Sequence, residues 1–233
     1  MAKAFQTWTV LPHDPIDKVE SNLWYVTGMM PDGRTQRAMC VARRRDGRLV
    51  IHNAIALEEP RMKELEAFGE PTFLVVPNSF HRQDAKIWKD RYPKIKVLCP
   101  AGGVEGVSKV VAVDGTYAGY PSDPDVELVH FDGCKDREGV MTVHSDGKTT
   151  AVINDMVMNI TRRGGFWGFM LAPTGRPAVP RISRWAVVSD KRAFRAHLDR
   201  LAGDATLARI IVSHGRPMTD DPRGVLRAVG AEL

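Results

Sequence analysis

The segment from Pro71 to Pro100 constrains the fold of this chain more than any other stretch. Thr72 to Val76 is a run of β-branched and apolar residues, which predicts a buried strand that ends at a Pro-Asn turn. A helix follows, in which Ala85, Trp88 and Tyr92 recur at helical spacing, and Lys96 to Leu98 begins a second strand. The segment therefore predicts a βαβ unit, the building block of an α/β fold.

A polar loop, Ser79 to Asp84, connects the first strand of this unit to its helix. In α/β folds the chemistry usually lies beyond the carboxyl ends of the strands, so His81 and Asp84 are candidate site residues. Asp84 also stands where an N-cap residue belongs, and a helix cap is the simpler prediction for it.

The composition predicts one soluble domain over residues 1–233. Of the 233 residues, 43% are hydrophobic, enough for one large core. No apolar run approaches the roughly 18 residues of a membrane span, and Met1 to Leu11 has no apolar signal core, so we expect a cytoplasmic protein without a membrane partner. Cys40, Cys99 and Cys134 form no C-x-x-C pair, which predicts free thiols.

The net charge of +5 and the pI of about 9.2 raise the question of a nucleic-acid partner. The two basic runs argue against it, because Arg43 to Arg45 precedes Asp46-Gly47 and Arg162-Arg163 precedes two glycines. Solvated turns explain both runs, and a binding face needs clustering that only the fold can provide.

The remaining strand and helix signals alternate in blocks along the chain. Short alternating or Val- and Thr-rich runs predict strands at Phe5–Leu11, Asn22–Met30, Arg37–Arg43, Arg48–His52, Val126–Phe131, Gly139–His144, Thr149–Ile153 and Arg209–Val212. Apolar residues at helical spacing predict helices at Glu58–Phe68, from Asp190, and at Asp221–Val229. The order is meander, helix, βαβ unit, meander, helix, strand, helix.

The segment from Thr161 to Arg181 is rich in glycine, proline and aromatic residues. Phe166, Trp167 and Phe169 lie close together in it. It is either a lid over a site or an irregular, packed cover, and we favour the packed cover because aromatic side chains mostly pack.

The layout and four local stretches resemble the metallo-β-lactamase superfamily, in particular a divergent branch without an assigned function whose metal motif is eroded. The resemblance implies an αββα sandwich, in which two mixed sheets pack between outer helices. The superfamily motif H-x-H-x-D-H aligns with the frame Ser79-Phe80-His81-Arg82-Gln83-Asp84. In this frame only His81 keeps the family's residue type.

Three further positions carry the resemblance. Gly133-Cys134 aligns with a Gly-His context, so Cys134 takes the place of a metal histidine, and it precedes Asp155 by 21 residues. Asp155 resembles the strand-end aspartate that bridges two metals in the superfamily. Ser213-His214-Gly215 resembles the final Gly-His-Gly.

The resemblance implies a hydrolase with a reduced metal site. Superfamily enzymes hold two metals, usually zinc, which generate a hydroxide that attacks an ester, amide, thioester or phosphate. Here the first metal position keeps His81 and Cys134, with Ser79 as a weak oxygen. The second keeps three ligands, one imidazole and two carboxylates, although Gln83 replaces a carboxylate. These are Asp84, Asp155 and His214. The resemblance then implies that the site holds at most one divalent metal, which is zinc or else manganese or iron. The alternative is that it holds no metal.

Each candidate also has a structural interpretation. Cys134 is more often a small buried residue than a ligand, Asp155 follows a strand in ordinary turn chemistry, and His214 is the strongest candidate. Three hypotheses follow: a one-metal hydrolase, a non-catalytic protein that binds a small molecule or partner on the same fold, and a nucleic-acid-associated protein, ranked last. For the other five histidines we favour structural roles, with His13 and His197 facing solvent. The remaining three are His52, His130 and His144.

Overall fold

The computed structural model describes residues 3–162 and 164–233 of the chain. The chain divides into two compact units, Met1–Leu128 and Val129–Leu233, each with its own hydrophobic cluster. The prediction of a single domain over residues 1–233 stays a prediction. In the described part of the chain, no helix has the length and apolar character to cross a bilayer.

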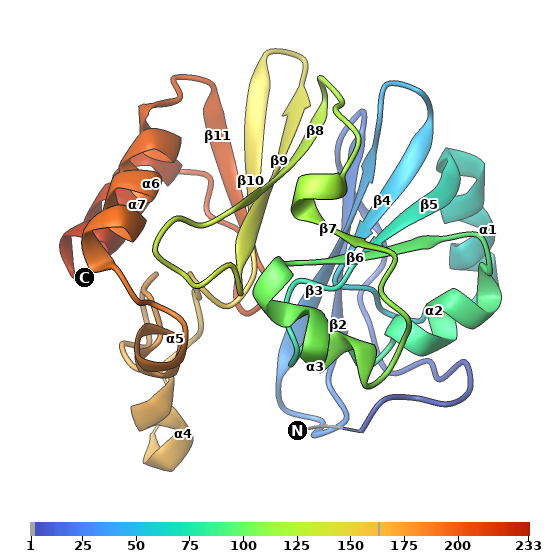
Figure 1. The fold of residues 1–233 in the computed structure, drawn as a ribbon, viewed down its shortest axis with the longest axis horizontal. Helices are drawn as coiled ribbons and strands as arrows, with labels where there is room; N and C mark the ends of the chain where they lie inside the picture. Colours follow the sequence, from blue (N-terminus) through green and yellow to red (C-terminus); the bar gives the residue numbers. More distant parts are fainter. Residues whose placement is uncertain (1–2, 163) are drawn as a thin grey trace. The chain divides into compact units, whose positions relative to one another are not determined.

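The first unit is built on a seven-stranded mixed sheet (Figure 1). Its strand order follows the sequence, with antiparallel pairing from β1 to β4 and parallel pairing from β4 to β7. The strands are β1 (Asp17–Glu20), β2 (Leu23–Met29), β3 (Gln36–Arg43), β4 (Arg48–His52), β5 (Glu70–Val75), β6 (Lys96–Cys99) and β7 (Gly115–Thr116).

Helices cover this sheet because alternate strand residues and one stripe of each helix are apolar. One buried cluster contains Val26, Met39 and Ile51 of strands β2, β3 and β4 together with Met62 and Trp88 of the helices. Every second residue along a strand points to the same face of the sheet, so these strand residues face the helices. The helices of the unit are α1 (Glu59–Phe68), α2 (Ala85–Arg91) and α3 (Val104–Ser108), with short 3-10 turns η1 (Ala101–Gly103) and η2 (Tyr117–Gly119). The predicted βαβ unit is confirmed as β5, α2 and β6, since β5 and β6 pair in parallel.

The second unit contains a four-stranded mixed sheet in the order β11-β10-β9-β8. Its strands are β8 (Val126–His130), β9 (Gly139–Ser145), β10 (Lys148–Ile153) and β11 (Leu207–Val212). β9 and β10 form the predicted hairpin, whose turn residues Asp146 and Gly147 both have positive φ, as its two-residue turn requires. β10 and β11 pair in parallel.

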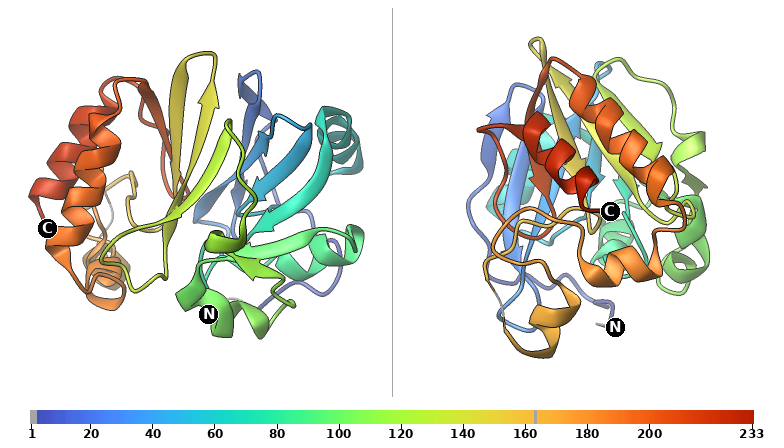
Figure 2. Two further views of the ribbon diagram at one scale, coloured as in Figure 1. Left: turned by 45° about the horizontal axis from the view of Figure 1, so that its top comes forward. Right: turned by 90° about the vertical axis from the view of Figure 1, so that its left-hand side faces the viewer.

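Two long helices of the second unit, α6 and α7, lie side by side along its sheet (Figure 2). Asp190 caps α6 by accepting a hydrogen bond from the Ala193 N–H, and Phe194 and Leu198 of α6 join the buried cluster of β10 and β11. The helices of the unit are α4 (Gly165–Met170), α5 (Arg181–Ala186), α6 (Lys191–Gly203) and α7 (Pro222–Ala231). The short helix α4 was not expected from the sequence.

The prediction of a strand at Phe5–Leu11 is wrong. These residues pair with no strand; instead the Phe5 N–H donates to the Gln83 carbonyl and the Trp8 indole N–H to the Leu57 carbonyl. Trp8 also packs against Trp88, with ring centroids 5.7 Å apart. The apolar residues of this segment therefore pack against the first unit as an extended segment outside the sheet. The first strand of the sheet is the polar segment β1.

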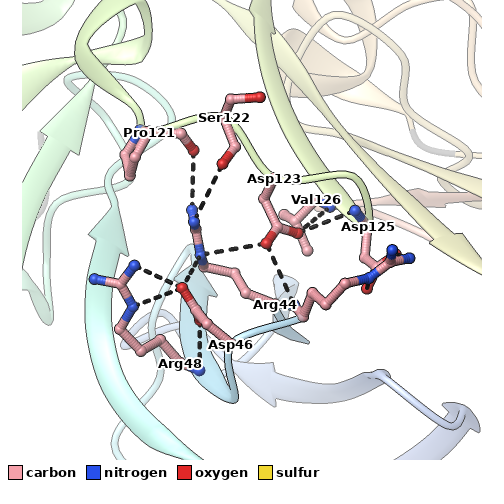
Figure 3. Close-up of polar contacts among 9 residues, drawn as sticks. Arg44, Asp46, Arg48, Pro121, Ser122, Asp123, Asp125 and Val126 are labelled. Carbon is pink, nitrogen blue, oxygen red and sulfur yellow. Dashed lines mark hydrogen bonds and ion pairs between the residues drawn. The ribbon is translucent and has the colours of Figure 1, made fainter.

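The basic run Arg43 to Arg45 lies at the β3–β4 hairpin, as predicted, but Arg44 is buried (Figure 3). Its guanidinium donates to the Pro121 carbonyl and lies 3.6 Å from the Asp123 carboxylate. Asp123 is buried too, and it accepts hydrogen bonds from the N–H groups of Arg45, Asp125 and Val126. The solvated-turn interpretation holds for Arg45 in the first run and for the exposed Arg162 in the second, whereas Arg163 lies outside the described residues.

Asp123→Ala is predicted to destabilise the protein by about 3–5 kcal/mol. It removes the buried carboxylate beside Arg44, which keeps only the partly exposed Asp46 at 3.4 Å, and it removes the acceptor of three backbone N–H groups. Asp125→Ala is the matched control: it removes the more exposed ion pair with Arg45, 2.6 Å long, and should cost about 1 kcal/mol or less. Urea unfolding of both variants measures the difference. Equal losses of stability would show that Asp123 does not anchor the hairpin.

Candidate metal centre

The end of the parallel pair β10 and β11 brings two polar turns to one edge of the second sheet. Ile153 and Val212, the last residues of the two strands, are register partners. Asn154 and Asp155 follow the first strand, and Ser213 and His214 follow the second. Because parallel strands end at the same edge, residues 59 positions apart in sequence become neighbours, as the hydrogen bond between the Ser213 hydroxyl and the Asn154 side chain shows.

Asp155 and His214 face each other at this edge, with His214 Nε2 at 3.4 Å from Asp155 Oδ1. This distance is longer than a good hydrogen bond. It matches the separation of two ligand atoms on one tetrahedral metal, because bonds of about 2.05 Å at a tetrahedral angle place the atoms about 3.3 Å apart. Both side chains are mostly buried, with exposed fractions of 15% for Asp155 and 11% for His214. The spacing of the pair is compatible with a shared cation.

The turn that carries His214 is held tightly. The His214 carbonyl accepts a hydrogen bond from the Asn159 N–H at 3.0 Å, and the Asn159 side chain donates to the Arg216 carbonyl. Gly215 has a φ of 114°, and a Cβ there would lie 2.0 Å from the Asn159 carbonyl oxygen. Only glycine fits this position, so the Ser-His-Gly sequence fixes where the imidazole of His214 points.

In the first unit, His81 is positioned by two asparagines. Asn78 Oδ1 accepts hydrogen bonds from the N–H groups of Phe80 and His81, at 2.8 and 3.0 Å, which closes the turn after β5. Asn53 follows β4 with a φ of 57°, a left-handed conformation that asparagine tolerates. Its Oδ1 lies 3.0 Å from His81 Nδ1.

The contacts of Asn53 set the tautomer of a neutral His81. The Asn53 Nδ2 group donates to the Ala38 carbonyl at 2.8 Å, so the atom facing the imidazole is the acceptor oxygen. His81 Nδ1 therefore carries the proton, and the lone pair lies on Nε2. Metal-binding histidines are commonly oriented by such a bond to the second nitrogen. Sequence reasoning did not identify Asn53, although its place directly after β4 was a usable signal.

Asp84 stands at the N-cap position of α2, as predicted, but its side chain makes no cap hydrogen bond. The predicted cap is wrong because the carboxylate is committed elsewhere: Oδ2 forms a buried ion pair with Arg37 of β3, and Oδ1 accepts from the Ala56 N–H at 3.0 Å. Burial raises the pKa of Asp84, and the Arg37 guanidinium and the Ala56 N–H oppose that rise. A role as a metal ligand would require Asp84 to leave Arg37 unpaired.

Asp84→Ala is predicted to destabilise the protein by about 3–5 kcal/mol, because it leaves the Arg37 guanidinium buried without a counter-charge. Replacing both partners, as Arg37→Met with Asp84→Leu, should recover much of that loss. Urea unfolding of the two variants provides the test. If the double variant is less stable than Asp84→Ala, the ion pair does not account for the cost.

Cys134 lies in the loop after β8 and is fully buried in the cluster of the second unit. The loop is pinned because the Gly133 carbonyl accepts hydrogen bonds from the N–H groups of Ser189 and Asp190. Burial, helped by Glu138 and Asp132, raises the pKa of Cys134 to about 12. Because the side chain is fully buried in an apolar cluster, we assign Cys134 a structural role. The predicted free thiols are confirmed for all three cysteines.

Cys134 is predicted to resist a thiol-specific reagent at pH 8 in the folded protein. With a pKa near 12, about one thiol in ten thousand is ionised at that pH. Labelling with and without denaturant, read by mass spectrometry of peptides, measures this. Rapid labelling of Cys134 in the folded state would contradict the assigned burial and favour a ligand role.

The two other motif positions also have structural contacts. Ser79 packs against the backbone of Gly106, where an added Cβ would lie 2.4 Å from the Ser79 Cβ. Gln83 is buried, and among the described residues neither polar atom of its side chain has a hydrogen-bond partner. The first unit therefore offers one well-oriented metal donor from the motif, which is His81.

The remaining histidines are mostly structural. Burial, together with the neighbouring His81, lowers the pKa of His52 to about 3. The prediction that His13 and His197 face solvent is wrong. The side chain of His13 is 5% exposed and lies 2.5 Å from the Glu58 carboxylate, and His197 is buried and accepts a hydrogen bond from the Asp132 N–H.

Comparisons with known proteins place this architecture. No protein-family model matches the sequence, and no curated protein matches it. Solved structures do match. The metallo-β-lactamase DIM-1 exposed to ceftazidime is 15% identical, with a TM-score of 0.66, 96% of this chain and 99% of that chain covered. A metallo-β-lactamase from Pontibacter korlensis is 11% identical, with a TM-score of 0.60. The match covers 94% of this chain and 99% of that chain.

A third match is the metallo-β-lactamase FIM-1 from Pseudomonas aeruginosa in its mono-zinc form, 10% identical, with a TM-score of 0.61 and 96% of each chain covered. This chain has the metallo-β-lactamase fold. The predicted fold class, two mixed sheets flanked by helices, is confirmed. At these identities the likeness concerns the fold, and the chemistry has to be argued from the site.

Proposed function

We propose that this protein is a metal-dependent hydrolase with a reduced site that holds one divalent metal. Asp155 and His214 are two of the proposed ligands, and their 3.4 Å separation is the observation that carries the proposal. A carboxylate and an imidazole at this spacing, both mostly buried, fit one tetrahedral cation better than they fit a direct hydrogen bond.

His81 is the third proposed ligand. Its support is the alignment with the superfamily motif together with the Nε2 lone pair set by Asn53. Each of the three ligands offers one donor atom, two nitrogens and one oxygen in all. Three protein ligands leave a fourth position for water, as catalytic zinc sites require.

The proposed set omits two residues that the sequence suggested. Asp84 is held by Arg37, and Cys134 is fully buried in the apolar cluster of the second unit. Without them the donors for a second metal are missing, so a two-metal site does not fit these residues. The solved mono-zinc form of FIM-1 is a precedent for one metal on this fold.

A metal in this site would polarise the substrate and acidify a bound water. The chain's own residues supply the orientation: Gly215 and Asn159 fix His214, and Asn53 fixes the ring of His81. Zinc suits two imidazoles and a carboxylate, and manganese or iron would also fit this donor set. The proposed reaction is hydrolysis of an ester or amide bond, the class to which the β-lactam ring cleaved by the structural neighbours belongs.

The second candidate function is a non-catalytic protein that binds a small molecule on the same fold. The observation that favours it is that four motif positions serve the structure: Ser79 packs on α3, Gln83 is buried, Asp84 pairs with Arg37, and Cys134 lies in the core. Metal content and turnover together separate the two candidates, since only the hydrolase requires both a bound metal and activity that depends on it.

Protein purified without chelator is predicted to hold up to one equivalent of metal. His214→Ala, Asp155→Ala and His81→Ala should each lower zinc affinity by more than the roughly 10–100-fold that loss of an outer-shell partner costs. Isothermal titration with zinc, together with elemental analysis, measures this. His144→Ala is the matched control, because His144 contacts Thr149 at the β9–β10 hairpin and should leave the affinity unchanged.

Turnover of a panel of chromogenic esters and β-lactams should follow metal content across the same variants. Two equivalents of tightly bound zinc would contradict the one-metal site. Zinc affinity that survives in Asp155→Ala and His214→Ala would remove the basis of the proposal, and metal binding without turnover would favour the non-catalytic candidate.

A further inference from the structure

The described part of the second unit carries a concentrated group of exposed aromatic side chains on α4 and α5. Seven large hydrophobic side chains are exposed in the described chain, and four of them lie here. Their exposed fractions range from 54% to 70%. They are Phe166, Trp167, Phe169 and Trp185. The prediction that this segment packs as a cover is wrong for these side chains.

Helix α4 contains three of these aromatic residues and no polar residue. Its sequence, Gly-Phe-Trp-Gly-Phe-Met, contains no polar side chain. Phe166 and Trp167 pack edge to face, with ring centroids 5.6 Å apart, so the two rings form one apolar body. α4 lies beyond α5, at the end of the unit away from the β9–β10 hairpin, where it projects (Figures 1 and 2).

Arginines are frequent in this segment, and acidic residues are missing from it. The sequence from Thr161 to Ser189 contains five arginines and no aspartate or glutamate. Arg181 stacks on Phe169, with its guanidinium carbon 4.1 Å from the ring centroid, and it lies 5.9 Å from the Trp185 ring. The aromatic group therefore has a positive rim.

A shallow cavity of about 440 Å³ opens beside the aromatic group, and three arginines and one glutamate line it. Arg176 pairs with Glu232 through two hydrogen bonds, which neutralises one of the three charges. Arg181 and Arg184 remain in excess, and the Nε of Arg184 is buried without a hydrogen-bond partner among the described residues. An anionic group, such as a phosphate, would satisfy this cavity.

We propose that α4 and α5 form a docking site for an anionic phospholipid bilayer. In it the aromatic residues of α4 enter the interface and the cavity of Arg181 and Arg184 receives a lipid phosphate. Apolar side chains of peripheral proteins bury about 5–10 Å into the headgroup region, and a six-residue helix, about 9 Å long, suits that depth. Arginines beside the insertion attract an anionic leaflet.

This occupant fits the charges better than the alternatives. A second copy of the chain would bring two arginine-rich rims together, which is repulsive. A nucleic-acid strand requires phosphate contacts along a track of stacking surfaces, and α4 offers no polar side chain for one. The absence of a membrane-spanning segment, which led to the expectation of no membrane partner, does not bear on an interfacial contact.

The test is sedimentation of the full-length protein with vesicles of phosphatidylcholine, with and without phosphatidylglycerol. The parent should bind the anionic vesicles, and high salt should weaken binding because it screens the arginines. Phe166→Ser with Trp167→Ser should weaken binding by at least about a hundredfold, since each buried aromatic contributes about tenfold or more. Arg181→Gln with Arg184→Gln should remove the preference for phosphatidylglycerol.

Val129→Ser and Arg45→Gln are the matched controls, because Val129 and Arg45 are an exposed apolar residue and an exposed arginine that belong neither to α4 nor to α5. They should bind vesicles as the parent does. Zinc content should be unchanged in every variant, so this test stands apart from the proposed metal site. No binding to anionic vesicles, or binding that the aromatic variant retains, would overturn the proposal. A dimer in light scattering that the aromatic variant abolishes would also overturn it, in favour of a second copy.

Discussion

Parallel strand pairing determines where polar side chains gather in each unit of this protein. In the first unit β4 and β5 end together, with His52 opposite Val75, and the Asn53 N–H continues the ladder by donating to the Val75 carbonyl. In the second unit Ile153 is opposite Val212, and the Ser213 N–H donates to the Ile153 carbonyl. The segments that follow β4 and β11 must then turn sharply at the edge of their own sheet. The turn residues with positive φ, Asn53 and Gly215, hold the two imidazoles that we assign to the metal.

The contacts of the aligned motif positions account for the reduced ligand set that we propose. The superfamily motif would place ligands at six or more positions, yet several of those positions here make structural contacts instead. Asp84 neutralises the buried Arg37, Cys134 fills the core under α6, and Ser79 is covered closely by α3. Losing any of these contacts would cost stability, so the positions are not available to a cation without rearrangement. The donors that remain are the three that we propose as ligands of one metal.

Local sequence patterns predicted the fold well because most elements have strong local signals. Strand β4 was predicted with its observed bounds, and the β9–β10 hairpin follows directly from Asp146-Gly147. The strand predicted at Phe5–Leu11 failed because alternation alone cannot tell a sheet partner from an extended segment whose Trp8 packs on Trp88. The polar strand β1 carries no apolar signal, and it forms because it can pair with β2.

The candidate site was less predictable because its contacts are long-range. The resemblance pointed to His214 and Asp155, and the structure brings these two together. It also pointed to Asp84, whose partner Arg37 lies 47 residues earlier, and no local pattern links the two. The prediction that the aromatic residues of α4 are packed failed for a related reason. Hydrophobic side chains are buried on average, and an exposed apolar surface is an exception to that average.

X-ray absorption spectroscopy of the zinc-loaded protein tests the central claim most directly. The proposed one-metal site predicts one shell of nitrogen and oxygen atoms at about 2.0–2.1 Å, with two imidazoles from His81 and His214, and with neither sulfur nor a second metal nearby. A zinc–sulfur distance of about 2.3 Å would show that Cys134 is a ligand after all. That result, or a metal–metal scattering contribution, would contradict the one-metal site.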